Sequence, residues 1–316
     1  LRKLGAHVDY YIPSRLHEGY GLNKEAIDRV YKGGTKLIIT VDNGISAIQE
    51  VDYALKLGVD VIITDHHEPQ EFVPKACAVV NPKQRDCPYP FRELAGVGVA
   101  LKLIQALSNV EFDNLREYIE LAAIGTVADM VPLIDENRII VKNGLSFLEN
   151  TKNVGIQTLK TLLNLNDTTF DTFKISFMVA PRLNATGRIA DPSVAVEFLL
   201  CEDEVKARTL AEDIQKINQE RQAIETKILG EAKDMVEQDV DLELDGVIVI
   251  SNPDWHPGVL GTVASKLVDI YNRPCILILE EGDESRGSGR SIQGINLFDA
   301  VSRVSHRLIR YGGHEQ

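Results

Sequence analysis

Apolar residues in the first third of the chain gather in short continuous runs separated by amphipathic stretches. The apolar runs lie at residues 36–41, 59–64 and 76–80, and helical periodicity marks residues 23–31 and 45–57. Runs without alternation of polar and apolar positions are typical of strands in a parallel sheet that helices cover on both faces. The pattern therefore predicts an α/β fold.

A long helix follows in the last third of the chain. Residues 202–238 contain one glycine and no proline, and their apolar residues recur at intervals of 3, 4 and 7. This periodicity predicts an amphipathic helix of about 55 Å, at roughly 1.5 Å per residue. A coiled-coil dimer seam is one interpretation, but α/β patterns on both sides of the helix favour a connector between two domains.

The remaining patterns complete two domains. The stretch from 97 to 200 is predicted to be mainly helical, with breaks at Gly125, Pro132, Gly155, Pro181 and Pro192. After the long helix we expect strands at 246–250 and 275–279 and helices at 261–270 and 297–308. The expected domains are a parallel-sheet domain at 1–200, a connecting helix at 201–243 and a smaller α/β domain at 244–316.

Both ends of the chain are expected to be truncated. Leu1 to Gly5 resembles the last turn of a helix, and the strand-like residues 6–12 follow it directly. The sequence after Gly312 carries no terminating signal.

Composition narrows the class of protein. The chain has 316 residues, of which 44% are hydrophobic and 26% charged, and no run reaches the roughly 20 apolar residues that span a bilayer. The first residues lack the pattern of a signal peptide. The four cysteines form no C-x-x-C spacing, and three lie in apolar runs where burial is expected. We expect a cytoplasmic protein with no membrane segment.

The net charge of −13 argues against a protein that coats nucleic acid by bulk attraction. More than half of this charge comes from residues 202–243, where 13 acidic residues stand against 6 basic ones, a net of −7. Residues 285–316 carry 5 arginines against 2 acidic residues, a net of +3. This segment is therefore still a candidate surface for binding anionic ligands.

Two of the apolar runs end directly on acidic or imidazole groups. One runs into Asp42, and the next runs into Asp65, His66 and His67. In open parallel sheets the ligand site lies beyond the carboxyl ends of the strands, so both groups are expected to face one crevice. Divalent ions such as Mn²⁺ accept mixed carboxylate and imidazole ligands. The alternatives are a helix N-cap for Asp42 and a hydrogen-bonded turn for the histidines.

Asp129 is a further candidate ligand. It follows an almost wholly apolar helical stretch, and an unpaired carboxylate is costly to bury, so it needs a partner or a metal ion. The alternative is a carboxylate at a helix end that faces solvent.

Three motifs resemble those of the DHH phosphoesterase family: Val41-Asp-Asn-Gly44, Thr64-Asp-His-His-Glu-Pro69 and Val127-Ala-Asp-Met130. Within the family, other segments favour the exonucleases specific for single-stranded DNA, namely 12–21, 181–188, 255–261, 287–291 and 312–314. The last three resemble the family's DHH-associated C-terminal domain. The family's first motif, Asp-x-Asp-x-Asp-Gly, does not occur in this chain, and its expected place is before Leu1.

The resemblance implies a role for each candidate. Asp42 would bridge two Mn²⁺ or Mg²⁺ ions, and His66 and Asp129 would complete one coordination shell. His67 would contact the scissile phosphate. Asp65 would not bind the metal itself but would orient an imidazole ring through a hydrogen bond. Without the first motif, this fragment is expected to lack part of the ligand set and to be inactive by itself.

Substrate contacts are expected mainly from arginines in loop-like sequence, where a guanidinium can bind phosphate oxygens bidentately. The candidates are Arg15, Arg182, Arg188, His256, Ser288, Arg290 and His314. For each histidine in this set, a structural role is an equally good interpretation as a phosphate contact. Platforms for stacking bases are poorly signalled, and the candidates are Tyr20, Trp255 and Tyr311.

These features favour a two-metal 5′→3′ exonuclease acting on single-stranded DNA in repair and recombination. The alternatives are an oligoribonucleotide or cyclic-dinucleotide phosphodiesterase and a catalytically silent nucleic-acid-binding module. The expected partners are single-stranded DNA with a 5′ end and a single-strand-binding protein or a helicase, and the expected state is a monomer.

Overall fold

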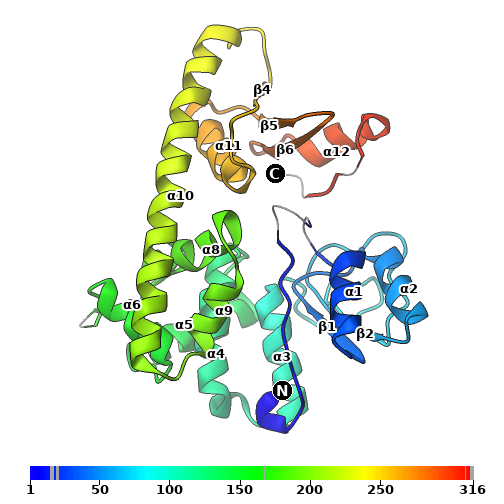
Figure 1. Ribbon diagram of the computed structural model, residues 1–316, viewed down its shortest axis with the longest axis vertical. Coiled ribbons are helices and arrows are strands. Elements are labelled where there is room, and N and C mark those ends of the chain that lie inside the picture. Colours follow the sequence, from blue (N-terminus) through cyan, green and yellow to red (C-terminus); the bar gives the residue numbers. More distant parts are fainter. Residues whose placement is uncertain (15–17, 19–20, 167, 310, 314–316) are drawn as a thin grey trace. The chain divides into compact units, whose positions relative to one another are not determined.

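The computed structural model describes residues 1–14, 18, 21–166, 168–309 and 311–313 (Figure 1). The chain divides into two compact units, Leu1–Gln215 and Lys216–Gln316. Both units combine helices with a sheet, which confirms the predicted α/β class. The domain boundaries expected from the sequence stay a prediction.

The N-terminal unit contains a parallel sheet in the order β1-β2-β3, formed by Leu37–Val41, Asp60–Thr64 and Ala78–Val80. Leu37 lies opposite Asp60 and Val41 opposite Thr64, so β1 and β2 end level with each other. Helices α1 (Lys24–Lys32) and α2 (Ile48–Lys56) pack on this sheet. Their buried side chains form one core with the strands: Ile27, Val51, Ala54, Val59, Val61 and Ile63. The predicted strands and helices of this region are confirmed.

The predicted strand at 6–12 is wrong. Arg2–Leu4 form a 3₁₀ turn that ends on Gly5 in the left-handed conformation, as expected for a helix end, but the residues after it have no regular structure. A strand needs a hydrogen-bonded neighbour, and in the described residues none pairs with this segment.

Helices make up the rest of the N-terminal unit. They are α3 (Gly96–Ser108), α4 (Arg116–Ala128), α5 (Asp135–Glu149), α6 (Val154–Leu162), α7 (Thr172–Lys174), α8 (Ala180–Ile189) and α9 (Ser193–Leu200), with a 3₁₀ turn at Phe112–Leu115. Breaks occur at Pro132 and Pro192, as predicted. Gly125 lies within α4 and Gly155 in the first turn of α6 instead. A Cβ on Gly125 would lie 2.8 Å from the side chain of Val97, and one on Gly155 would lie 2.3 Å from the carbonyl oxygen of Phe198, so close packing explains glycine at both positions.

Pro181 also lies within a helical run rather than at its end. The chain continues from α7 through a π-helical turn, Ile175–Val179, into α8. In an α-helix a proline clashes with the carbonyl four residues before it and donates no hydrogen bond. The wider π turn before Pro181, in which the Ala180 amide donates to the Ile175 carbonyl, accommodates the ring at the first turn of α8.

The long helix is confirmed as α10, Glu204–Asp239, and the boundary between the two units falls within it. The C-terminal unit continues with β4 (Ile248–Asn252), α11 (Pro257–Tyr271), β5 (Cys275–Glu281), β6 (Glu284–Arg290) and α12 (Leu297–Ser302). Strand β4 pairs with β5 in parallel, and β6 pairs with β5 antiparallel. The helix predicted at 297–308 ends at Ser302 and is followed by a separate 3₁₀ turn, Ser305–Arg307.

Two further expectations concern burial. Cys201 and Cys275 are buried, but Cys77 is exposed and Cys87 half-buried, so fewer cysteines are buried than predicted. Among the described residues, no helix has both the length and the apolar composition needed to cross a membrane.

The crossing of α4 and α5 depends on Gly144. A Cβ built on this glycine would lie 2.3 Å from the Cβ of Ala123 and 2.8 Å from the carbonyl oxygen of Ile119, both on α4. No other residue allows this approach, because one of the two contacts is backbone. The position of α4 relative to α5 therefore depends on this contact, and so does the position of Asp129 at the end of α4.

Replacing Gly144 with alanine is expected to destabilise the N-terminal unit by about 1–3 kcal/mol, the usual cost of overpacking. The matched control is Gly230→Ala in α10, where a new Cβ meets nothing within 4 Å. There alanine should stabilise the helix by up to about 1 kcal/mol through its higher helix propensity. Chemical denaturation followed by circular dichroism measures both, and a stabilised Gly144→Ala protein would contradict the close crossing.

Candidate metal centre

Two neighbouring parallel strands end on the residues that sequence analysis singled out. The amide of Asp42, directly after β1, donates to the carbonyl of Thr64 at 2.9 Å, and the amide of Asp65, directly after β2, donates to the carbonyl of Val80 at 3.0 Å. The loops after the two strands therefore start side by side at the carboxyl edge of the sheet, where open α/β sheets place their ligand sites.

The carboxylate of Asp65 is the buried centre of this edge, with 1% of the residue exposed. Its Oδ2 accepts a hydrogen bond from the amide of Ile45 at 2.9 Å. Its Oδ1 accepts from the amides of His66 and His67 at 2.7 and 3.2 Å and lies 2.6 Å from Nδ1 of the His67 ring. These donors compensate for the loss of water around the charge.

Hydrogen bonding sets the charges of Asp65 and His67. Burial raises the pKa of Asp65, but hydrogen bonds from the His67 ring and the Ile45 amide outweigh it, and the pKa lies below its ordinary value. The hydrogen bond to Asp65 raises the pKa of His67, burial lowers it in part, and the charges of Asp65, Asp42 and Asp129 raise it further. These interactions favour the charged form of the His67 ring more than in a free imidazole, and they favour a proton on Nδ1, which faces Asp65.

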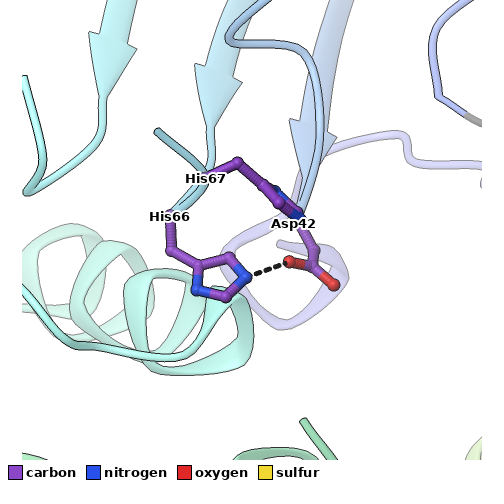
Figure 2. Close-up of side chains that lie close together, drawn as sticks. All are labelled: Asp42, His66 and His67. Carbon is purple, nitrogen blue, oxygen red and sulfur yellow. Dashed lines mark ion pairs between the residues drawn. The ribbon is translucent and has the colours of Figure 1, made fainter. Parts of the chain in front are cut away.

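His66 lies between two carboxylates. Its Nε2 is 3.0 Å from Oδ1 of Asp42 and 3.5 Å from Oδ2 of Asp129. Figure 2 shows the His66 ring directed at the Asp42 carboxylate, with His67 beside them. One possible ligand atom from each of Asp42, His66 and His67 lies within 4.8 Å of the others. The His66 side chain is nearly buried, whereas the Asp42 side chain is 47% exposed, so the cluster is open to solvent on the Asp42 side.

Asp42 is held in place by its backbone conformation and by a close helix. Its φ of 64° lies in the left-handed region, which aspartate tolerates better than most residues. A Cβ built on Gly96, the first residue of α3, would lie 2.2 Å from Oδ1 of Asp42. Only glycine permits this approach. Sequence analysis missed Gly96, although Gly96-Val-Gly98 at the start of a predicted helix was a signal for it.

Asp129 reaches the cluster from the end of α4. It is the C-cap of the helix, and its amide donates to the carbonyl of Gly125 at 2.9 Å. The apolar residues of α4 are buried, among them Ile119, Ala123 and Val127, and this packing fixes the direction of the helix. The Asp129 side chain is 35% exposed and lies beside His66, so it does not simply face solvent.

The donor set fits a divalent ion. One imidazole nitrogen and two carboxylate oxygens converge from three separate segments, a mixed set that Mn²⁺ accepts. Magnesium takes mainly oxygen ligands, which Asp42 and Asp129 offer. The arrangement favours a metal site over the N-cap and turn alternatives, because neither requires the three segments to meet.

The predicted arginines of the N-terminal unit lie on a helix. Arg182 and Arg188 are part of α8, so their expected placement in loops is wrong, since the π turn carries the helix past Pro181. The Arg182 side chain donates to Oε1 of Gln215 at 2.7 Å and to the carbonyl of Met178 at 2.5 Å, and burial lowers its pKa. Arg15 lies outside the described residues.

In the C-terminal unit, His256 is the N-cap of α11. Its Nδ1 accepts a hydrogen bond from the amide of Gly258 at 3.1 Å, and burial lowers its pKa, so the ring is favoured as the neutral acceptor. His314 lies outside the described residues.

Ser288 and Arg290 lie in strand β6 rather than in the predicted loop, because β6 pairs with β5. Gly261 of α11 makes room for both side chains. A Cβ built on it would lie 3.1 Å from Oγ of Ser288 and 3.0 Å from Nη2 of Arg290. The side chains of these two candidates therefore lie next to each other, against the first turns of α11.

The candidate aromatic platforms have different surroundings. Trp255 is 2% exposed and its Nε1 donates to Glu231 at 3.0 Å, so it is a core residue and that prediction is wrong. The Tyr311 ring lies 5.7 Å from that of Phe298. Tyr20 lies outside the described residues.

Known proteins share both the sequence and the fold of this chain. Residues 1–126 match the N-terminal domain of the DHH family and residues 244–316 match the DHHA1 domain. A crystal structure of exonuclease RecJ bound to manganese is 34% identical in sequence, with a TM-score of 0.83. The match covers 100% of this chain and 78% of the chain in that structure. The chain belongs to the RecJ family.

Other members of the RecJ family extend the similarity. The single-stranded-DNA-specific exonuclease RecJ of Bacillus subtilis is 48% identical over 99% of this chain, which spans 40% of the length of that relative. The structure of RecJ from Thermus thermophilus in complex with Mn²⁺ is 31% identical, with a TM-score of 0.85, and the chain covers 45% of it.

If the cluster is a metal site, the chain should bind Mn²⁺, and Asp42→Asn should weaken binding at least about tenfold, because a ligating charge is lost. Asp60→Asn is the matched control, since this exposed residue begins the strand that ends next to Asp65. Isothermal titration calorimetry or Mn²⁺ paramagnetic resonance measures the affinities. Equal affinities for the two variants would exclude Asp42 as a ligand.

Asp65→Asn is expected to lower the pKa of His67 in the metal-free protein, because the strongest cause of its rise is removed. The extra stability of the charged pair is complete below the pKa of an unfolded histidine, about 6.5, and is lost as the pH rises through the higher folded pKa. NMR titration of the imidazole nitrogens measures the shift, with the exposed His7 as the internal control. An unchanged His67 pKa would show that Asp65 does not set its charge.

Proposed function

We propose that this chain forms the nuclease core of a metal-dependent exonuclease that degrades single-stranded DNA in the 5′→3′ direction, with a role in DNA repair and recombination. The observation that carries the proposal is the convergence of Asp42, His66 and Asp129 at the carboxyl edge of a parallel sheet. The family supports it, since its Bacillus subtilis member is described as a single-stranded-DNA-specific exonuclease.

Asp42, His66 and Asp129 are the proposed metal ligands, with Asp42 bridging two Mn²⁺ or Mg²⁺ ions. Such ions, when bound, would activate water and neutralise charge on the phosphoryl oxygens. A RecJ structure bound to manganese supports the choice of metal. The Asp-x-Asp-x-Asp-Gly motif of the family is absent from these 316 residues, so this chain supplies only part of the proposed ligand set.

His67 is proposed to contact the scissile phosphate. Its Nδ1 is engaged by Asp65, which fixes the ring and turns Nε2 to the opposite side. The raised pKa keeps the ring charged over a wider pH range, and a charged imidazole donates a stronger hydrogen bond to a phosphate oxygen than a neutral one. Asp65 therefore acts through His67 by orienting it.

The proposed phosphate contacts are spread over both units. Arg182 and Arg188 would bind from α8, and Ser288 and Arg290 from β6, with guanidinium groups matching the geometry of phosphate oxygens. His256 offers Nε2, because its Nδ1 caps α11. Arg15 and His314 stay in the proposal as residues outside the described part of the chain.

The remaining proposals concern the setting of the enzyme. Its substrate would be single-stranded DNA with a 5′ end, and a single-strand-binding protein or a helicase would bring it to that substrate. We further propose that it acts as a monomer in the cytoplasm.

The protein at its natural length, supplied with Mn²⁺, is expected to release mononucleotides from the 5′ end of a 5′-phosphorylated single strand and to leave duplex DNA intact. His67→Ala should lower the rate at least about 100-fold, the usual contribution of a group that acts on the transition state. The control is His7→Ala, at an exposed position on the N-terminal segment.

Gel analysis of products from strands labelled at either end separates the possible outcomes. Preferential cleavage of dinucleotides would indicate an oligonucleotide phosphodiesterase instead. Binding without cleavage in any divalent metal would indicate a silent nucleic-acid-binding module.

A further inference from the structure

Two phenylalanines lie exposed on the helical run that carries Arg182 and Arg188. Phe173 in α7 and Phe177 in the π-helical turn are 64% and 66% exposed. Their ring centroids lie 4.7 Å apart, at an interplanar angle of 36°. Single exposed apolar residues are common, but two adjacent exposed rings form a surface that suits a binding partner.

Packing of the fold does not account for these rings. The other side of the run buries Ile175 and Val179 in the main core of the N-terminal unit, and Met178 packs against that core. The four-residue spacing of Phe173 and Phe177 brings their side chains together on the outer side.

The charge of the run favours a polyanion as the partner. Residues 171–191 carry Lys174, Arg182 and Arg188 against the two aspartates at their ends, a net of +1 within a protein of net charge −13. Lys174 lies 3.5 Å from the carboxylate of Asp171, and Arg182 donates to Gln215 and Met178. Exposed rings combined with cations on one element are what single-stranded nucleic acids need, because bases stack on the rings while cations follow the phosphates. An apolar protein partner would require the rings but not the cations.

The π turn is a second local feature of the same surface. Phe177 lies within it, and the Ala180 amide donates to the Ile175 carbonyl five residues earlier. Such turns are rare and occur frequently at functional sites. Here the turn joins α7, which carries Phe173, to α8, which carries the arginines, in one continuous helical run.

We propose that Phe173 and Phe177 form a base-stacking platform for single-stranded DNA. The inference rests on the proposed exonuclease function and adds a contact with bases to the proposed contacts with metal and phosphate. Every base has a π face, so the platform gives affinity without sequence preference.

Binding of fluorescein-labelled oligo(dT), measured by anisotropy in EDTA so that no cleavage occurs, tests the platform. Phe173→Ala/Phe177→Ala and Phe173→Leu/Phe177→Leu should each weaken binding about fivefold or more, the lower limit for one stacked base. Phe72→Ala is the matched control, because Phe72 is 68% exposed in the same unit. The leucine variant should keep the salt dependence of binding, since the rings neutralise no phosphate.

A Phe177→Trp variant gives a direct readout of stacking. Its indole fluorescence should be quenched when oligo(dT) is added, relative to the unmodified protein, whose one tryptophan, Trp255, is buried. Circular dichroism checks that each variant is folded, which the exposure of both rings leads us to expect.

The outcomes separate this inference from the function on which it rests. If the unmodified protein does not bind oligo(dT), the exonuclease proposal fails together with the platform. If it binds and the alanine variant binds equally well, only the platform is overturned. Full binding by the leucine variant would also overturn it, because an apolar contact with a protein would then explain the exposed pair.

Discussion

The buried carboxylate of Asp65 determines the geometry of the candidate metal centre. It accepts hydrogen bonds from Ile45, in the loop after β1, and from His66 and His67, in its own loop. Parallel pairing of β1 and β2 brings the two loops to one edge of the sheet, but it does not determine the conformation of either loop. One charged group bonded to both loops removes that freedom, so the ligand side chains are positioned before any ion binds.

Much of this arrangement could be predicted from the sequence, because its determinants are local. Apolar runs that end on Asp42 and Asp65 predicted both the strands and the edge at which the site lies. The 3, 4 and 7 spacing of apolar residues predicted α10 to within a few residues of its bounds, Glu204–Asp239. Asp129 was found because a lone carboxylate after an apolar helix needs a partner, and it lies 3.5 Å from His66.

The errors arise where tertiary contacts override local signals. Pro181 reads as a helix breaker, yet the π turn before it keeps the helix intact and places Arg182 on it. The glycines around Ser288 read as a loop, but pairing with β5 makes that segment a strand. Gly144 gives little signal in a sequence, since its importance lies in neighbours on α4 that are distant along the chain.

The close approach of α3 to Asp42 has an electrostatic consequence. The first residue of α3 lies against the Asp42 carboxylate, and α4 ends on Asp129. A helix carries partial positive charge at its N-terminus and partial negative charge at its C-terminus. The dipole of α3 therefore stabilises the anion at Asp42, while the dipole of α4 opposes a bare carboxylate at Asp129 and favours a cation beside it. The C-terminal end of α4 thus attracts a metal ion to this edge, in addition to the side chains that would coordinate it, whereas the N-terminal end of α3 acts on the carboxylate of Asp42.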